Sequence, residues 1–108
     1  MIPPLSFTVP AIGDFVAKHR TMGTQIRIEQ AYRKALGGSE EDAPESLRLI
    51  AAVQSQLSVL LETSPTGFVL DDAHINDCYS IYAALRAEED RFREGVAKER
   101  QAAGESPQ

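Results

Sequence analysis

Acidic side chains and one histidine crowd a single point of this 108-residue chain: Asp71, Asp72, His74 and Asp77. Carboxylates and an imidazole can together bind a divalent metal ion. They also suit an ordinary helix start, because carboxylates there accept hydrogen bonds from free backbone N–H groups. We adopt the second interpretation, so the sequence predicts no metal site and no cofactor.

The other groups that could act in catalysis stand apart from one another. His19 and His74 fall in different segments, and neither has metal-ligand spacing to the single cysteine, Cys78. His19 stands between two basic residues, which predicts solvent exposure. Cys78 falls between Ile75 and Tyr82 on an apolar stripe, which is typical of a small core residue rather than a nucleophile. The sequence therefore predicts no catalytic residue and no enzymatic activity.

Five basic residues form one cluster in the first third of the chain: Lys18, Arg20, Arg27, Arg33 and Lys34. Arg20, Arg27 and Lys34 recur at seven-residue steps, which is somewhat similar to a DNA-recognition helix. However, no short helix precedes them in helix-turn-helix spacing. A net charge of −5 also disfavours phosphate binding. We expect no nucleic-acid partner, and a DNA-binding regulator stays an alternative.

Charge is unevenly distributed along the chain. Residues 1–38 hold five basic and two acidic side chains, whereas residues 39–90 hold eleven acidic and two basic ones. The last eighteen residues hold four basic and three acidic side chains. A molecule with oppositely charged ends is suited to stacking head to tail on copies of itself. Ordinary solvated faces that happen to cluster are the alternative explanation.

The first twenty residues contain three prolines and predict a short β-hairpin rather than a helix. Phe7-Thr8-Val9 alternates with period two, Gly13-Asp14 is a turn signal, and Phe15–Lys18 is a second β-prone run. Two strands alone are marginal in water, so the hairpin must pack on helices. We expect the side chains that face those helices to be Phe7, Val9 and either Phe15 or Val16.

A helical period begins after Thr21 and predicts a first helix. An apolar stripe runs from Ile28 to Leu36 at steps of three and four residues. Either Thr21 or Thr24 can cap its start. Gly37 follows the stripe and is available for a left-handed cap at the end of the helix.

A second helix is predicted after the acidic stretch Ser39–Asp42. Asp42 and Glu45 resemble a capping box with Pro44 in the first turn, and the apolar pattern continues to about Glu62. Eight Leu, Ile or Val residues stand between positions 47 and 61, more than one stripe requires. Most should be buried within the monomer, and the rest should face a partner. Together with two basic residues, the expected partner-binding set is Leu49, Val53, Leu57, Leu60, Arg20 and Arg27.

A third helix is predicted to begin near Asp71 or Asp72 and to fray after Lys98. The expected fold is thus mainly α, with about three helices packed together and a short N-terminal β-hairpin. Residues 1–100 form one domain, and residues 101–108 form a disordered tail. The sequence shows neither a bilayer-spanning apolar run nor a signal peptide, and its single cysteine fits a reducing cytoplasm.

Several short segments, in their order and spacing, carry a family resemblance over about residues 5–94. They are Phe7-Thr8-Val9-Pro10, Lys18-His19-Arg20-Thr21, Gln25-Ile26-Arg27-Ile28 leading to Tyr32, Leu57-Ser58-Val59-Leu60, Ser64-Pro65-Thr66-Gly67-Phe68, Tyr79–Arg86 and Glu88–Arg93. The chain resembles the small tail assembly chaperones of long-tailed bacteriophages and prophages. It departs from many of them at Phe68, where tryptophan is expected, and at Gly23, which is unusual in an early helix turn.

The resemblance implies a non-enzymatic assembly factor in the cytoplasm of a bacterial host. Such proteins self-associate, bind the long helical tape measure protein and keep it soluble until tail-tube subunits polymerise around it. The partners implied are the tape measure protein, the major tail tube protein and further copies of this chain, with no membrane. The alternatives are a small homo-oligomeric adaptor and the prophage DNA-binding regulator considered above.

Overall fold

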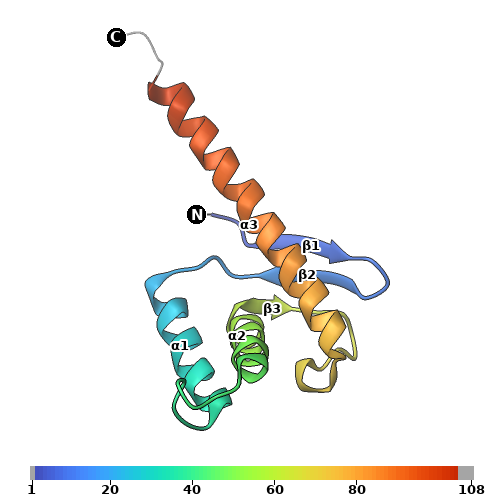
Figure 1. Ribbon diagram of the computed structural model, residues 1–108. Coiled ribbons are helices and arrows are strands. Elements are labelled where there is room, and N and C mark those ends of the chain that lie inside the picture. The colour runs from blue at the N-terminus through green and yellow to red at the C-terminus, as the bar shows by residue number, and fades with distance from the viewer. Residues whose placement is uncertain (1, 105–108) are drawn as a thin grey trace.

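The computed structural model describes residues 2–104, which form three α-helices and a three-stranded antiparallel sheet (Figure 1). In chain order the elements are β1 (Leu5–Val9), β2 (Gly13–Ala17), α1 (Met22–Leu36), α2 (Glu45–Leu60), β3 (Leu61–Thr63), the 3-10 turn η1 (Leu70–Asp72) and α3 (Ile75–Gly104). The predicted class, mainly α with a short N-terminal β-hairpin, is confirmed. Within residues 2–104, no helix combines the length and the apolar character needed to span a bilayer.

The hairpin buries one face, as its period-two pattern predicts. Phe7 of β1 pairs with Phe15 of β2, and their rings stack with centroids 5.6 Å apart. Phe7, Val9 and Phe15 are all buried, which confirms the predicted inward set and selects Phe15 over the half-exposed Val16. The predicted turn at Gly13-Asp14 is wrong. The chain reverses over residues 10–12, and β2 already begins at Gly13.

The third strand was not predicted. The second helix was expected to reach Glu62, but α2 ends at Leu60 and the chain continues extended as β3. Lys18 donates its backbone N–H to the Leu60 carbonyl at 2.8 Å, and Thr63 pairs with Val16 of β2. Backbone pairing with the hairpin edge therefore overrides the helix propensity of this segment.

The helix caps test the predicted helix ends. Thr21 caps α1, its side chain accepting from the Thr24 N–H at 3.1 Å while the Thr24 hydroxyl accepts from the Thr21 N–H. Gly37 ends α1 with a left-handed φ of 70°, as predicted. The predicted cap at Asp42 is wrong, because α2 follows Pro44 without a side-chain cap hydrogen bond.

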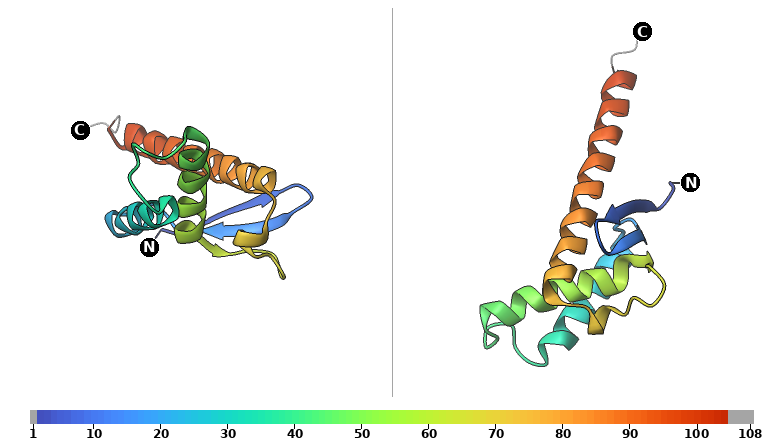
Figure 2. Two further views of the ribbon diagram at one scale, coloured as in Figure 1. Left: turned by 60° about the horizontal axis from the view of Figure 1, so that its bottom comes forward. Right: turned by 90° about the vertical axis from the view of Figure 1, so that its right-hand side faces the viewer.

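The long helix α3 differs from its prediction at both ends. It begins at Ile75, where the His74 Nδ1 accepts from the Asn76 N–H, and the expected start at Asp71 or Asp72 is instead the turn η1. It lies across the hairpin, and its second half projects beyond the other elements (Figures 1 and 2). It continues past Lys98 to Gly104, so the first part of the expected tail is helical. Residues 105–108 lie outside the described residues.

The core lies where the hairpin, α2 and α3 meet, with α1 packed along α2 (Figure 2). Phe15 contributes from the sheet, and its ring meets Phe68 edge-on at a centroid distance of 5.4 Å. Each helix adds one or more fully or nearly buried side chains, among them Ile28, Leu57, Leu60, Ile81 and Leu85. The core therefore takes Val53, Leu57 and Leu60 of α2, whereas Leu47, Leu49 and Ile50 stay exposed.

Candidate partner-binding surface

Three of the α2 residues predicted to bind a partner belong to the core. Leu57 and Leu60 have no exposed surface, and Val53 is 5% exposed. The hairpin and α3 cover this side of α2. Because they are covered, these three residues cannot contact a partner protein while the monomer is folded. Of the predicted α2 set, only Leu49 lies at the surface, with 55% of its area exposed.

A different stripe of α2 is open to solvent and forms an apolar groove. On one side, Leu47, Ile50 and Ala51 face Ala31 and Ala35 of α1 across a hollow. On the other side, a second hollow is lined by Ile50 and Val53 of α2 and by residues at the start of α3, namely Ile75, Cys78 and Tyr79. The two hollows share Ile50, Gln54 and Asp71, so they form one continuous surface, which we call the α2 groove.

The α2 groove combines an apolar floor with polar rims of opposite charge. Leu47 is 36% exposed, Ile50 40% and Ile75 41%, so water reaches the floor at all three. Lys34 stands on the α1 rim and Asp71 on the η1 rim. An apolar floor between charged rims matches the requirement for binding an amphipathic helix.

Sequence reasoning did not single out Leu47 and Ile50 as exposed apolar residues of α2, although a signal for them exists. Leu47, Ile50 and Gln54 stand at i, i+3 and i+7, one line along a helix. This line is separate from that of Val53, Leu57 and Leu60, which leads into the core. The excess of apolar residues on α2 was thus correctly recognised but assigned to the wrong line.

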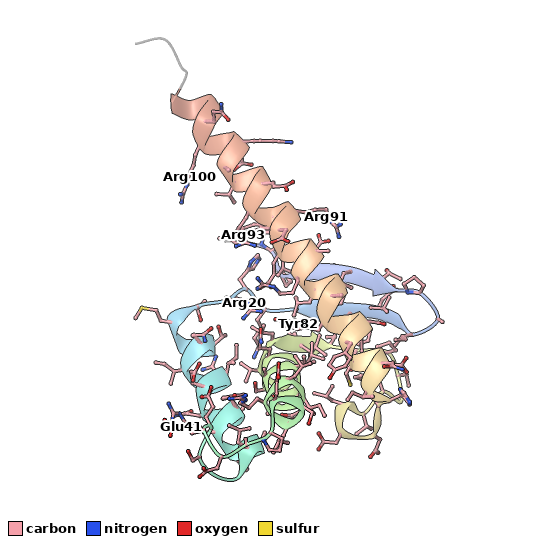
Figure 3. All side chains as sticks on the ribbon, in the orientation of Figure 1. Arg20, Glu41, Tyr82, Arg91, Arg93 and Arg100 are labelled. Atoms are coloured by element: carbon pink, nitrogen blue, oxygen red, sulfur yellow. The ribbon has the colours of Figure 1, made fainter. Side chains whose placement is uncertain are left out.

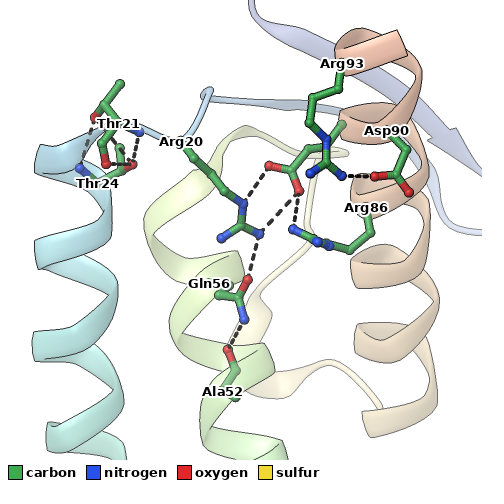
Figure 4. Close-up of polar contacts among 9 residues, drawn as sticks. Arg20, Thr21, Thr24, Ala52, Gln56, Arg86, Asp90 and Arg93 are labelled. Atoms are coloured by element: carbon green, nitrogen blue, oxygen red, sulfur yellow. Dashed lines mark hydrogen bonds and ion pairs between the residues drawn. The ribbon is translucent and has the colours of Figure 1, made fainter.

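Arg20 was predicted to contact a partner, and the structure instead places it in an internal polar network. It projects from the segment between β2 and α1 (Figure 3). Its Nε donates to Glu89 Oε2 at 2.7 Å and its Nη2 donates to Gln56 Oε1 at 2.7 Å (Figure 4). Arg86 Nη1 donates to Glu89 Oε1 at 3.2 Å. Arg20 therefore joins the start of α1 to both other helices.

Arg27, the other predicted charged contact, is exposed on α1 and makes no ion pair with a described residue. It does not line the α2 groove. The predicted set of six residues is therefore not brought together: Arg27 and Leu49 lie at the surface on different helices, and the other four are engaged inside the fold.

His19 and Cys78 both pack against other residues of the fold. His19 was expected to be solvent-exposed, and the structure shows it half-buried: its ring packs on Phe92 with ring centroids 4.5 Å apart, and its Nε2 donates to the Pro3 carbonyl at 2.7 Å. Cys78 is half-buried against the core. Burial raises the pKa of the Cys78 thiol above its ordinary value, and the neighbouring Asp77 carboxylate raises it further.

Asp71 and Asp72 lie at the surface in η1, and Asp77 lies at the surface in the first turn of α3. Among residues 2–104, no three His, Cys, Asp or Glu side chains are grouped so that they could hold a metal ion. The surface with the clearest binding chemistry is thus the α2 groove. Comparison of the chain with protein-family models, with curated proteins and with solved structures found no match.

Proposed function

We propose that this chain is a non-enzymatic tail assembly chaperone that binds the tape measure protein of a long-tailed bacteriophage and keeps it soluble. In this proposal it acts in the bacterial cytoplasm and releases its client when the major tail tube protein polymerises. The observation that carries the proposal is the α2 groove, whose floor is open to solvent at Leu47, Ile50 and Ile75.

The proposed mechanism is the covering of apolar stripes on a long helical client. Each stripe that enters the α2 groove removes apolar surface from water, which stabilises the complex by roughly 25 cal/mol per Å². Lys34 and Asp71 on opposite rims favour a client helix whose charges are arranged in the complementary sense. Many weak contacts along one client give high total affinity while each contact stays displaceable. Displaceability is what tube assembly requires.

The polar network supports this proposal over a DNA-binding regulator. Of the three basic residues at seven-residue steps, Arg20 is bound to Glu89 and Gln56. Of this row only Arg27 and Lys34 are fully exposed, so the seven-residue row that is similar to a recognition helix offers two free charges in place of three to DNA phosphates.

Co-expression tests the proposal. The partner is the tape measure protein of the same phage or prophage, and its soluble fraction is compared with and without this chain. The proposal predicts that the client becomes soluble and co-purifies with the chain. A client that stays insoluble beside a well-folded chain would contradict the proposal and favour a homo-oligomeric adaptor.

A further inference from the structure

A small apolar hollow lies at the η1 end of the α2 groove, on the side of α2 opposite α1 (Figures 1 and 2). We call it the η1 hollow, and its lining includes Ile50 and Val53 of α2, Leu70 and Asp71 of η1, and Cys78 and Tyr79 of α3. Its volume is about 180 Å³, below the roughly 300–1,000 Å³ of sites that bind drug-sized molecules. An apolar cavity of about 150 Å³ accepts one benzene ring. The η1 hollow therefore has room for a single large apolar side chain.

The mouth of the η1 hollow is apolar and open to water. Ile50 and Ile75, both in its lining, are 40% and 41% exposed, and Val69 next to Leu70 is 54% exposed. A side chain that enters the hollow would bring its neighbours on the partner against these residues. A helix presents such neighbours at i, i+3 and i+4, on the same face as the entering side chain.

The surroundings of the η1 hollow are acidic. Residues 49–85 contain four acidic side chains and neither lysine nor arginine. Three of the four are exposed, Asp71 and Asp72 in η1 and Asp77 in the first turn of α3. None of the three makes an ion pair with a described residue. These carboxylates therefore complement a partner whose side chains carry positive charge.

The acidic stretch Ser39–Asp42 differs from the η1 hollow in this respect. Glu40 and Glu41 share a hollow with Arg33 and Arg48, so cations of the chain itself already surround them. Arg33, Arg48 and Lys34 are all absent from the lining of the η1 hollow. The two acidic regions thus differ in their surroundings and allow a matched comparison.

We propose that the η1 hollow anchors a basic amphipathic helix of the client. One side chain of the size of leucine or phenylalanine enters the hollow, while a lysine or arginine one helical turn away meets Asp71 and Asp72. This inference rests on the proposed function, because it names the part of the client that the α2 groove takes. Lys34 lies on the opposite rim of the larger hollow, so an acidic side chain farther along the same client helix meets Lys34. The groove thereby binds the client helix in one direction.

Two synthetic amphipathic peptides test the preferred charge without a client. Each has about 14 residues, which form roughly 20 Å of helix. Both carry the same leucine stripe, and their polar positions are lysine in one and glutamate in the other. Isothermal titration calorimetry should show that the glutamate peptide binds the wild-type chain about tenfold more weakly than the lysine peptide, or not at all. Equal affinities would overturn the inference of a basic partner.

Cys78 reports whether the peptide occupies the η1 hollow, because Cys78 is part of its lining. With the lysine peptide at about ten times its Kd, iodoacetamide should modify Cys78 about tenfold more slowly, since only the unoccupied fraction of the chain reacts. An unchanged rate with saturating peptide would place the peptide elsewhere and overturn the inference.

Two double variants with the same change in net charge test the aspartates. Asp71→Asn/Asp72→Asn removes the carboxylates of η1, which makes no side-chain cap hydrogen bond. Glu40→Gln/Glu41→Gln removes two carboxylates from the acidic stretch. The first should weaken binding of the lysine peptide roughly three- to tenfold, and the second by less than about twofold. Equal effects of the two variants would overturn the inference, because they would show a general attraction to the acidic chain.

A larger side chain in the lining tests the hollow itself. Ala73 lies in the lining and has an extended backbone that accepts any side chain, whereas Ala83 is exposed on α3 outside it. With circular dichroism spectra unchanged, Ala73→Leu should weaken the lysine peptide about tenfold and Ala83→Leu should not. Equal affinities of these two variants would overturn the inference.

The client experiment separates this inference from the proposed function. Protection of Cys78 by the lysine peptide, beside a client that stays insoluble on co-expression, would contradict the proposed function alone. A client that becomes soluble, beside a Cys78 that the lysine peptide does not protect, would contradict the anchoring role of the η1 hollow alone.

Discussion

The guanidinium of Arg20 holds the carboxylate of Glu89 through two hydrogen bonds, at 2.7 and 3.3 Å, although the residues stand 69 positions apart in sequence. The Glu89 side chain is only 10% exposed. Arg20 lies just before α1, and Glu89 lies near the middle of α3. With Gln56 of α2 as a third partner, this pair fixes the three helices relative to one another.

Replacing Glu89 should therefore destabilise the fold. Glu89→Ala leaves Arg20 and Arg86 facing each other without their shared acceptor, and we expect a loss of about 1–3 kcal/mol in the free energy of unfolding. The loss should fall below that of a fully buried ion pair, because the Arg20 side chain remains 27% exposed. Urea denaturation measures it. The exposed Glu94→Ala should change stability by less than about 0.5 kcal/mol, and equal effects of the two variants would contradict the role given to Glu89.

Truncation of Leu57 distinguishes core from surface on α2. Leu57 has no exposed area, so Leu57→Ala should cost about 2–5 kcal/mol through lost burial and a cavity. Leu49→Ala should cost much less, because its side chain is 55% exposed. Thermal or urea unfolding compares the two. A small loss for Leu57→Ala would mean that α2 turns a different face to the core.

The Thr21 hydroxyl that caps the start of α1 should contribute measurably to the stability of the protein. Thr21→Ala removes the acceptor for the Thr24 N–H and should destabilise the protein by about 1 kcal/mol. Asp42→Ala should change stability by less than about 0.5 kcal/mol, because α2 has no side-chain cap at its start. A larger loss for Asp42→Ala than for Thr21→Ala in urea denaturation would reverse this assignment of the caps.

The raised pKa of Cys78 predicts slow thiol chemistry. At about pH 8 an ordinary cysteine is partly thiolate, and a higher pKa means that a smaller fraction of Cys78 is reactive. Iodoacetamide should modify Cys78 more slowly in the folded protein than in urea. Asp77→Asn removes the smaller of the two contributions and should speed the reaction modestly. A folded-state rate equal to that in urea would contradict the burial of this thiol.

Local signals in the sequence were sufficient to predict the ends of some helices and insufficient to predict the ends of others. Thr21 marks the start of α1 and Gly37 marks its end. Both act through contacts within a few residues, which sequence alone can indicate. The end of α2 was different, since Leu61 and Glu62 are good helix formers and adopt a strand only by pairing with β2.

Whether the residues of the candidate site could be predicted depended on the same distinction between local and long-range structure. The surplus of apolar residues on α2 was readable, but Ile50 and Val53 are chemically alike and stand three positions apart. Only the elements packed against α2 decide that Val53 is 5% exposed and Ile50 is 40% exposed. Likewise, nothing near Arg20 in sequence indicates its distant partner Glu89.

The α2 groove is tested most directly by placing a charge on its floor and measuring client solubility. Ile50→Asp adds a carboxylate to the groove, whereas Ile26→Asp makes the same change at an exposed α1 position outside it. Circular dichroism first checks that both variants are folded. Each variant is then co-expressed with the tape measure protein. We predict that Ile50→Asp leaves the client insoluble while Ile26→Asp keeps it soluble, as the wild type does. Equal client solubility with the two variants would contradict the assignment of the α2 groove as the client-binding surface.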